Sequence, residues 1–181
     1  MIYRTRTYIA ADWDSDSNAV EQLNKWNDSN YYSLSFINAH DLQQARDNSL
    51  NCSIKSSLAT RLNASKTFIL IVGNNTKTVR SGSCQYCGSK NSWTGACARG
   101  YSVDNRSYIE YECEKAVRDG LNIIVLYKAT TVDRTKCPDA VKNVEIQSGT
   151  VFCLSHIYPF WTFTKKRGIL KFFSHIFRLD F

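Results

Sequence analysis

The sequence has no apolar run of the roughly 18 residues that a membrane span requires. Its first residues, Met1 to Thr7, carry charge but no apolar segment of the kind found in secretory signals. It also lacks internal repeats, a dividing linker and the patterns of helix-turn-helix, RRM and KH nucleic-acid-binding modules. We therefore expect one cytoplasmic domain without a membrane span, and the length of 181 residues fits a single domain.

A disulfide framework is not expected, because the cysteines number seven, an odd count. Cys52, Cys113 and Cys153 lie in apolar or helical contexts, where free thiols are commonly buried. This use of cysteine is typical of a reducing compartment.

What the chain has in excess is positive charge, with a net value of +7. Such charge can attract an anionic ligand, nucleic acid or a lipid surface. Much of it lies between Lys165 and Arg178, where a solvated basic face is the favoured interpretation. A basic amphipathic helix is predicted over about residues 167–179, and we expect it to pack on the sheet rather than lie on a membrane.

Strand-like and helix-like segments alternate along the chain, which predicts an α/β protein with a parallel sheet. The predicted strands cover residues 7–11, 31–37, 66–72, 122–127 and 150–154. We expect a flavodoxin-like three-layer fold with a five-stranded parallel sheet in the order 2-1-3-4-5. Ligands of such sheets bind at the carboxyl ends of the strands, near the switch between the first and third strands.

One predicted helix, from Ser107 to Asp119, carries a carboxylate at the edge of its apolar stripe. At about 100° per residue, the stripe holds Ile109, Cys113 and Ala116. Glu112 lies on its flank, on the same edge as Tyr108, whereas Glu114 and Lys115 should point toward water. A partly desolvated carboxylate has a raised pKa that suits acid/base or charge-stabilising work. Spacing alone favours the alternative that Glu112 is an ordinary surface residue.

The segment Tyr108-Ile109-Glu110-Tyr111-Glu112 resembles a pattern of TIR domains. In that family the helix after the third strand carries a motif close to Ser-x-Trp-Cys-x-x-Glu. The pattern of the TIR-like sensor subunit of Thoeris anti-phage systems, aromatic-aliphatic-x-Tyr-Glu, is more similar to this segment. The resemblance covers roughly residues 5–128, although residues 38–48 lack the Arg-Asp-Pro-Gly type of sequence found in receptor TIR domains.

The resemblance implies an enzyme acting on NAD as its substrate. Glu112 would be catalytic, and Ala11, Asp12, Asp41 and Tyr108 would bind NAD or a related nucleotide. It also implies self-association through TIR-like surfaces and a downstream nucleotide-sensing effector. The whole chain would be a single TIR-like domain, with an insertion at about 79–104 and a C-terminal extension at about 155–181. The alternative is a non-catalytic TIR-like interaction module in signal transduction.

The chemistry needs few protein groups. Cleaving the bond between nicotinamide and ribose builds positive charge on the ribose, and one fixed carboxylate can stabilise that charge. Nicotinamide leaves as a neutral group, so no strong general acid is required. Hydrolysis and cyclisation to a signalling nucleotide both stay open.

A second candidate site is the cysteine set Cys84, Cys87 and Cys97, which resembles half of a zinc knuckle. No histidine lies nearby to supply a fourth ligand, so zinc is the less favoured interpretation. A redox pair at Cys84 and Cys87, or free thiols in a surface insertion, are the alternatives. A zinc-bearing nucleic-acid binder built on this insertion and the basic tail is a weaker third hypothesis for the whole chain.

Two further patterns are excluded on their residues. The segment from Gly73 to Thr78 lacks the second glycine directly before lysine that a phosphate-binding P-loop requires. The aspartates 12, 14 and 16 suggest a phospho-receiver domain, but no acceptor aspartate follows the strand at 66–72.

Overall fold

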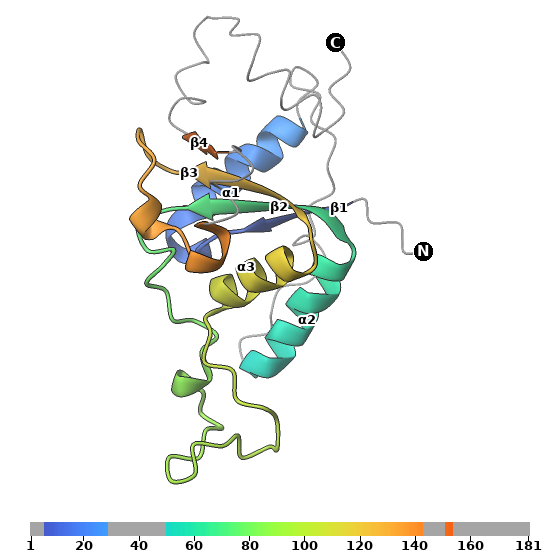
Figure 1. Cartoon of the computed structure of the whole chain (residues 1–181), viewed down its shortest axis with the longest axis vertical. Helices are drawn as coiled ribbons and strands as arrows, with labels where there is room; N and C mark the ends of the chain where they lie inside the picture. Colours follow the sequence, from blue (N-terminus) through green and yellow to red (C-terminus); the bar gives the residue numbers. More distant parts are fainter. Residues whose placement is uncertain (1–5, 29–49, 143–150, 154–181) are drawn as a thin grey trace, which may run out of the picture.

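The computed structural model describes residues 6–28, 50–142 and 151–153. These residues form an α/β structure around a parallel sheet (Figure 1). The strands are β1 (Arg6–Ala10), β2 (Ser65–Val72), β3 (Asn122–Tyr127) and β4 (Val151–Cys153). They neighbour one another in the order β1-β2-β3-β4, and every pair is parallel.

The four described strands are the predicted first, third, fourth and fifth strands, and they neighbour one another as expected. The predicted strand at 31–37, the loop at 38–48 and the helix at 167–179 lie outside the described residues. The five-stranded order 2-1-3-4-5 therefore stays a prediction.

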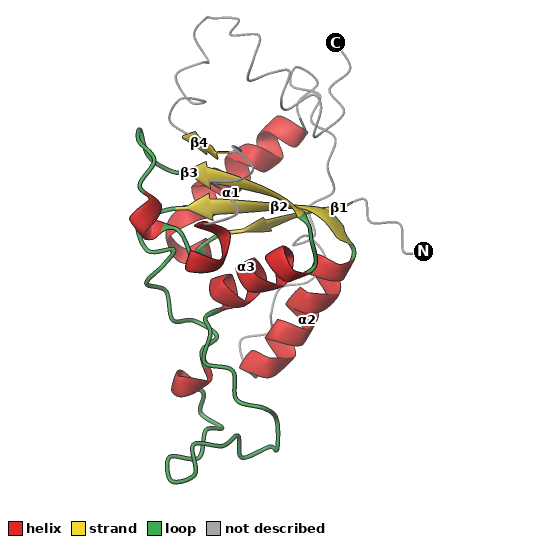
Figure 2. Cartoon of the chain, in the orientation of Figure 1, coloured by secondary structure: helices red, strands yellow, loops and turns green. Residues whose placement is uncertain are grey.

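Helices cover both faces of the sheet, with α1 on one side and α2 and α3 on the other (Figure 2). Their bounds are α1 (Trp13–Asn27), α2 (Asn51–Asn63) and α3 (Tyr108–Arg118). Because side chains alternate along a strand, Phe68 and Leu70 of β2 enter the core shared with α2 and α3. Every residue of β2 from Thr67 to Val72 is buried, as expected of a central strand covered on both faces.

Helix α3 begins at a capping box formed by Ser107 and Glu110. The Glu110 backbone N–H donates to Ser107 Oγ at 3.1 Å, and the Ser107 N–H donates to Glu110 Oε2 at 2.7 Å. The helix ends before Gly120, whose φ of 67° suits glycine. Glu114 is exposed as predicted, but the prediction for Lys115 is wrong. Lys115 is buried because its Nζ lies 2.6 Å from Asp119 Oδ2, one turn along the helix.

Helix α1 begins at Trp13, directly after β1, and the backbone carbonyl of Asp12 accepts from Asp16 N at 2.7 Å. None of the helices in the described ranges has both the length and the hydropathy of a membrane span.

Between β2 and α3 the chain forms an irregular arm that projects from the layers of the fold (Figure 1). We use "the arm" for residues 79–104, the range of the predicted insertion. It contains one short 3₁₀ turn, Cys84–Tyr86, and one antiparallel bridge between Lys90 and Cys97. Its root is anchored by backbone bonds from Cys84 N to Asp104 O at 3.0 Å and from Tyr108 N to Ser81 O at 2.8 Å.

Candidate functional site

Glu112 lies in the second turn of α3 with its side chain facing β1. The residue is only 4% exposed, and the Tyr8 hydroxyl donates a hydrogen bond to Glu112 Oε1 at 2.5 Å. Burial raises the pKa of Glu112 to about 8, against the lowering effects of the Tyr8 hydrogen bond and the Arg61 charge. Burial, followed by the charge of Glu112, raises the pKa of Tyr8 well above its usual range. The Glu112 carboxyl is therefore mostly protonated near neutral pH.

The burial of Glu112 is deeper than its position on the helix predicted. The flank of the apolar stripe is covered because α2 packs beside α3 and because Tyr8 reaches across from β1. A carboxyl in this position can take up or release a proton near neutral pH. Once ionised, it is a strongly desolvated negative charge that can stabilise a nearby cation.

Ala11 and Asp12, the predicted nucleotide-binding residues after β1, are both buried at the carboxyl edge of the sheet. The Asp12 carboxylate accepts a hydrogen bond from Ser15 Oγ, with 2.6 Å between Oδ2 and Oγ. The hydrogen bond of Glu112 is to Tyr8, within β1. The remaining predicted binding residue, Asp41, lies outside the described ranges.

The same edge holds a buried charge that the sequence interpretation missed. Asp16 is 1% exposed, and its Oδ1 lies 3.2 Å from Lys128 Nζ. Within the described part of the chain, Asp16 Oδ2 has no hydrogen-bond partner. Burial raises the pKa of Asp16, and the Lys128 ammonium opposes that rise. The one signal in the sequence for this close packing was Gly73, the glycine directly after the buried strand β2. A Cβ at Gly73 would lie 2.2 Å from Asp16 Oδ2, so the carboxylate needs a glycine at this position.

Tyr108, the predicted pocket aromatic, braces the root of the arm against α2. Its hydroxyl donates to Asn51 Oδ1 at 2.9 Å, and its ring lies against Gly82. Burial raises the pKa of Tyr108 to about 12. In this arrangement Tyr108 supports the chain that leads into α3, one turn before Glu112.

The arm carries the three cysteines that the sequence analysis weighed as zinc ligands. Cys84, Cys87 and Cys97 are half-buried free thiols. Among the described residues, no three side chains of His, Cys, Asp or Glu are grouped so that they could hold a metal ion. Cys113 is buried as predicted, whereas Cys52 is only half-buried.

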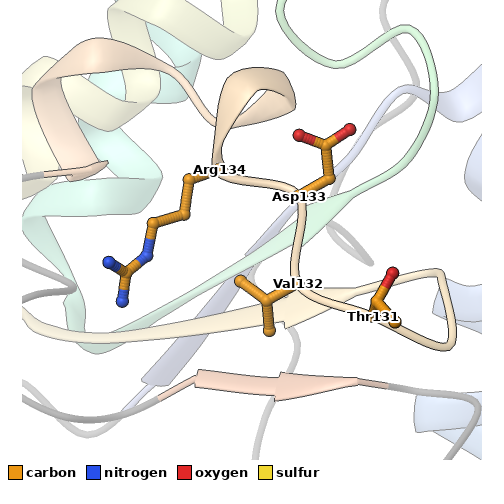
Figure 3. A pocket seen from close by; sticks show the side chains of 4 residues that line it. All are labelled: Thr131, Val132, Asp133 and Arg134. Carbon is orange, nitrogen blue, oxygen red and sulfur yellow. The ribbon is translucent and has the colours of Figure 1, made fainter.

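Glu112 lines neither of two hollows found on the described surface. The larger, of about 710 Å³, is lined by Thr131 to Arg134 in the loop after β3 (Figure 3). The second, of about 370 Å³, lies between the start of α3 and residues 138–140. We call it the α3 groove. Its lining residues are Lys77, Asn105, Arg106, Glu110, Glu114, Pro138, Asp139 and Ala140.

The fold defines an α/β protein with a parallel sheet covered on both faces. Residues 8–81 match the family described as Thoeris protein ThsB, TIR-like domain. This match confirms the predicted resemblance over less than half of the chain. It begins within β1, spans α1, α2 and β2, and ends before Glu112. No curated protein matches the chain.

Proposed function

We propose that the chain is a TIR-like signalling protein of anti-phage defence that cleaves NAD, with Glu112 as its catalytic carboxylate. The observation that carries the proposal is the buried Glu112, held by Tyr8 and with its pKa raised to about 8. It lies in a chain whose residues 8–81 match a Thoeris TIR-like family. Proteins with this fold have many different functions, so the proposed reaction is argued from the residues of the site.

The reaction breaks the bond between the ribose C1′ and the nicotinamide nitrogen. Both bonding electrons leave with nicotinamide, which becomes neutral, and positive charge builds on the ribose. The ionised Glu112 carboxylate stabilises this charge in a site with little competing water. Water then attacks C1′ to give ADP-ribose, or another group of the same nucleotide attacks to give a cyclic product.

Protonation sets a condition on this role. At neutral pH the Glu112 carboxyl is mostly neutral, because burial has raised its pKa to about 8. The positively charged nicotinamide ring of bound NAD lowers that pKa and favours the carboxylate. Binding of NAD thus ionises Glu112, and the ionised carboxylate is the form that NAD cleavage needs.

Access sets a second condition. Glu112 is 4% exposed and bonded to Tyr8, so NAD reaches the carboxyl only after its cover moves. We include such an opening step in the proposal, and an infection signal or self-assembly would supply it. Ala11, Asp12, Asp41 and Tyr108 are the residues proposed to bind the nucleotide, on a five-stranded flavodoxin-like sheet.

The test is nicotinamide release from NAD by the wild type, Glu112→Gln and Glu114→Gln. Glu114 is the matched control, because it is a glutamate of the same helix with an exposed side chain. We expect Glu112→Gln to lose at least about a hundredfold in rate, the size seen when one transition-state charge contact is removed. Glu114→Gln should keep the wild-type rate. Equal rates for the wild type and Glu112→Gln would remove Glu112 from catalysis.

The second candidate function is a non-catalytic TIR-like module that acts through protein contacts. It is favoured by one observation, that Glu112 lines neither hollow and is paired inside the core. The two functions differ in their response to Glu112→Gln. A module without NAD chemistry would keep its assembly and its defence phenotype in this variant, whereas the enzyme would lose the phenotype.

A further inference from the structure

The arm holds two cysteines in one short turn, which is the small helical segment on the arm in Figure 1. Cys84 begins this 3₁₀ turn, and Cys87 follows it in an extended conformation. The backbone N–H of Cys87 donates to Cys84 O at 3.2 Å. Such a bond between positions i and i+3 closes a turn whose end Cα atoms lie within about 7 Å. A disulfide spans Cα atoms about 4.4–6.8 Å apart, so the backbone brings the two cysteines to about the separation that a disulfide requires.

Both thiols of the turn also lie near one aromatic side chain, that of Tyr108. Burial raises the pKa of Tyr108 to about 12, and negative charge on Cys87, Cys52 and Cys84 adds to the rise. Charges shift the pKa of a neighbouring group mainly over short distances. Cys84 and Cys87 therefore share the surroundings of one hydroxyl group, with Cys52 of α2 as the third thiol beside it.

The rest of the fold holds this turn in place. Cys84 N donates to Asp104 O at 3.0 Å, and Asn51 Nδ2 donates to Ser83 O at 3.2 Å. Within the turn, Ser83 Oγ accepts from Gln85 N at 3.3 Å. A turn that is already ordered keeps its two thiols close, so little further conformational entropy is lost when they are joined.

Small molecules can reach these two thiols. Both are half-buried, and the neighbouring residues Gln85, Tyr86 and Gly88 are exposed. Cys113 and Cys137, in contrast, are both 0% exposed in the core. Since the oxidation of a thiol follows its exposure, the pair in the arm should react and the two core thiols should not.

We propose that Cys84 and Cys87 form a reversible redox site, which a small-molecule disulfide such as oxidised glutathione converts into an intrachain disulfide. The thiolate of one cysteine attacks a sulfur of the small disulfide, which gives a mixed disulfide and releases one small thiol. The second cysteine then attacks the mixed disulfide, and the second small thiol leaves. The protein loses two electrons and the two thiol protons, which end on the two released thiols.

The reverse reaction needs only an excess of small thiol, because a disulfide in an exposed turn is readily attacked. The site stands apart from NAD cleavage, since it uses neither Glu112 nor Tyr8. Its test therefore stays valid whichever way the test of NAD cleavage turns out.

Equilibration of the full chain with mixtures of reduced and oxidised glutathione tests the proposal. After alkylation of the remaining thiols, trypsin places both cysteines of the turn in one peptide, residues 81–90. Cys97 and Cys52 fall in the separate peptides 91–99 and 47–55. We expect peptide 81–90 to lose the mass of two hydrogens without a link to another peptide. An excess of reduced glutathione should restore both thiols.

Serine variants identify the pair. In Cys84→Ser and in Cys87→Ser the reaction should stop at the mixed disulfide, so peptide 81–90 gains one glutathione instead of losing two hydrogens. Cys97→Ser is the matched control, because Cys97 is another half-buried thiol of the arm. It should leave the disulfide within peptide 81–90 unchanged. Circular dichroism spectra matching the wild type would show that each variant is folded.

Unfolding the chain separates the effect of the built turn from the nearness of the two cysteines in sequence. In concentrated urea the turn is lost, so a smaller fraction of the pair should be oxidised at the same ratio of reduced to oxidised glutathione. Equal fractions in the folded and unfolded chain would overturn the proposal.

Three further results would overturn it. The first is a peptide 81–90 that keeps two thiols, or carries only glutathione, in excess oxidised glutathione. The second is a disulfide that links this peptide to 91–99 or to 47–55. The third is loss of the disulfide in Cys97→Ser.

Discussion

Tyr8 in β1 and Glu112 in α3 form a buried hydrogen bond of 2.5 Å across 104 positions of the sequence. The bond joins the first strand to the helix that carries the proposed catalytic carboxylate. It also partly offsets the cost of burying that carboxylate, since it lowers a pKa that burial raises. Tyr8 therefore positions Glu112 and lowers the pH at which it ionises, against the larger effect of burial.

Replacing Tyr8 with Phe should raise the pKa of Glu112 further, because the hydrogen bond that favours the carboxylate is removed while burial stays. Carboxyl titration of Glu112 by NMR measures this shift, with Tyr86→Phe as the control, since Tyr86 is 71% exposed. We also expect a loss of about 1–3 kcal/mol in the free energy of unfolding, because a buried carboxyl is left without its partner. An unchanged or lower Glu112 pKa in Tyr8→Phe would contradict the positioning role.

The pH dependence of stability should reveal the same carboxyl. Folding raises the pKa of Glu112 from 4.5 to about 8, so the native state binds more protons than the unfolded state between these values. The stabilisation is full below about pH 4.5 and is lost as pH rises toward 8. Relative to Glu112→Gln, the wild type should lose up to about 1.4 kcal/mol per pH unit across this window.

Urea unfolding of both proteins at a series of pH values measures this difference. Two curves that run parallel from pH 5 to pH 8 would mean that Glu112 is not buried as described.

Gly73 should be intolerant of even one added methyl group. A Cβ at this position would lie 2.2 Å from Asp16 Oδ2, so Gly73→Ala should cost about 1–3 kcal/mol of stability. Gly88→Ala is the control, because a Cβ there meets nothing within 4 Å. In a double mutant with Asp16→Ala, the cost of Gly73→Ala should shrink, since the clashing carboxylate is gone. Additive costs would show that the two residues are not in contact.

Substitution of Gly82, at the root of the arm, should destabilise the protein for two reasons that can be tested separately. Its φ is +90°, and a Cβ there would lie 2.4 Å from the Tyr108 ring. Gly100 has a φ of +76° with nothing within 4 Å of a Cβ. Gly100→Ala should cost about 1 kcal/mol through the backbone alone, and Gly82→Ala should cost more. Thermal unfolding of both variants measures the difference, and equal costs would exclude the predicted clash.

The four described strands could be predicted because their own residues determine them. The segment at 66–72 is a nearly continuous apolar run, and such a run is typical of a strand covered on both faces. The depth of Glu112 could not be predicted in the same way. Helical periodicity placed it on the flank of the stripe, and its burial depends on Tyr8 in β1 and on α2, which are distant in sequence.

Two other buried charges were missed for different reasons. Lys115 looked exposed by periodicity, yet it is buried beside Asp119, its partner one helical turn away at i+4. Asp16 pairs with Lys128, 112 positions away, where β3 ends. The Asp16 pair follows from tertiary packing, which single-sequence patterns do not contain.

The pH profile of nicotinamide release tests the central claim most directly. If the ionised Glu112 carboxylate stabilises the ribose cation, the rate of NAD cleavage rises with pH and levels off at or below about pH 8, the value to which burial raises this pKa. Glu112→Gln should be slow and independent of pH over this range. A wild-type profile shared by Glu112→Gln would contradict the account, because the group that titrates would then be another residue.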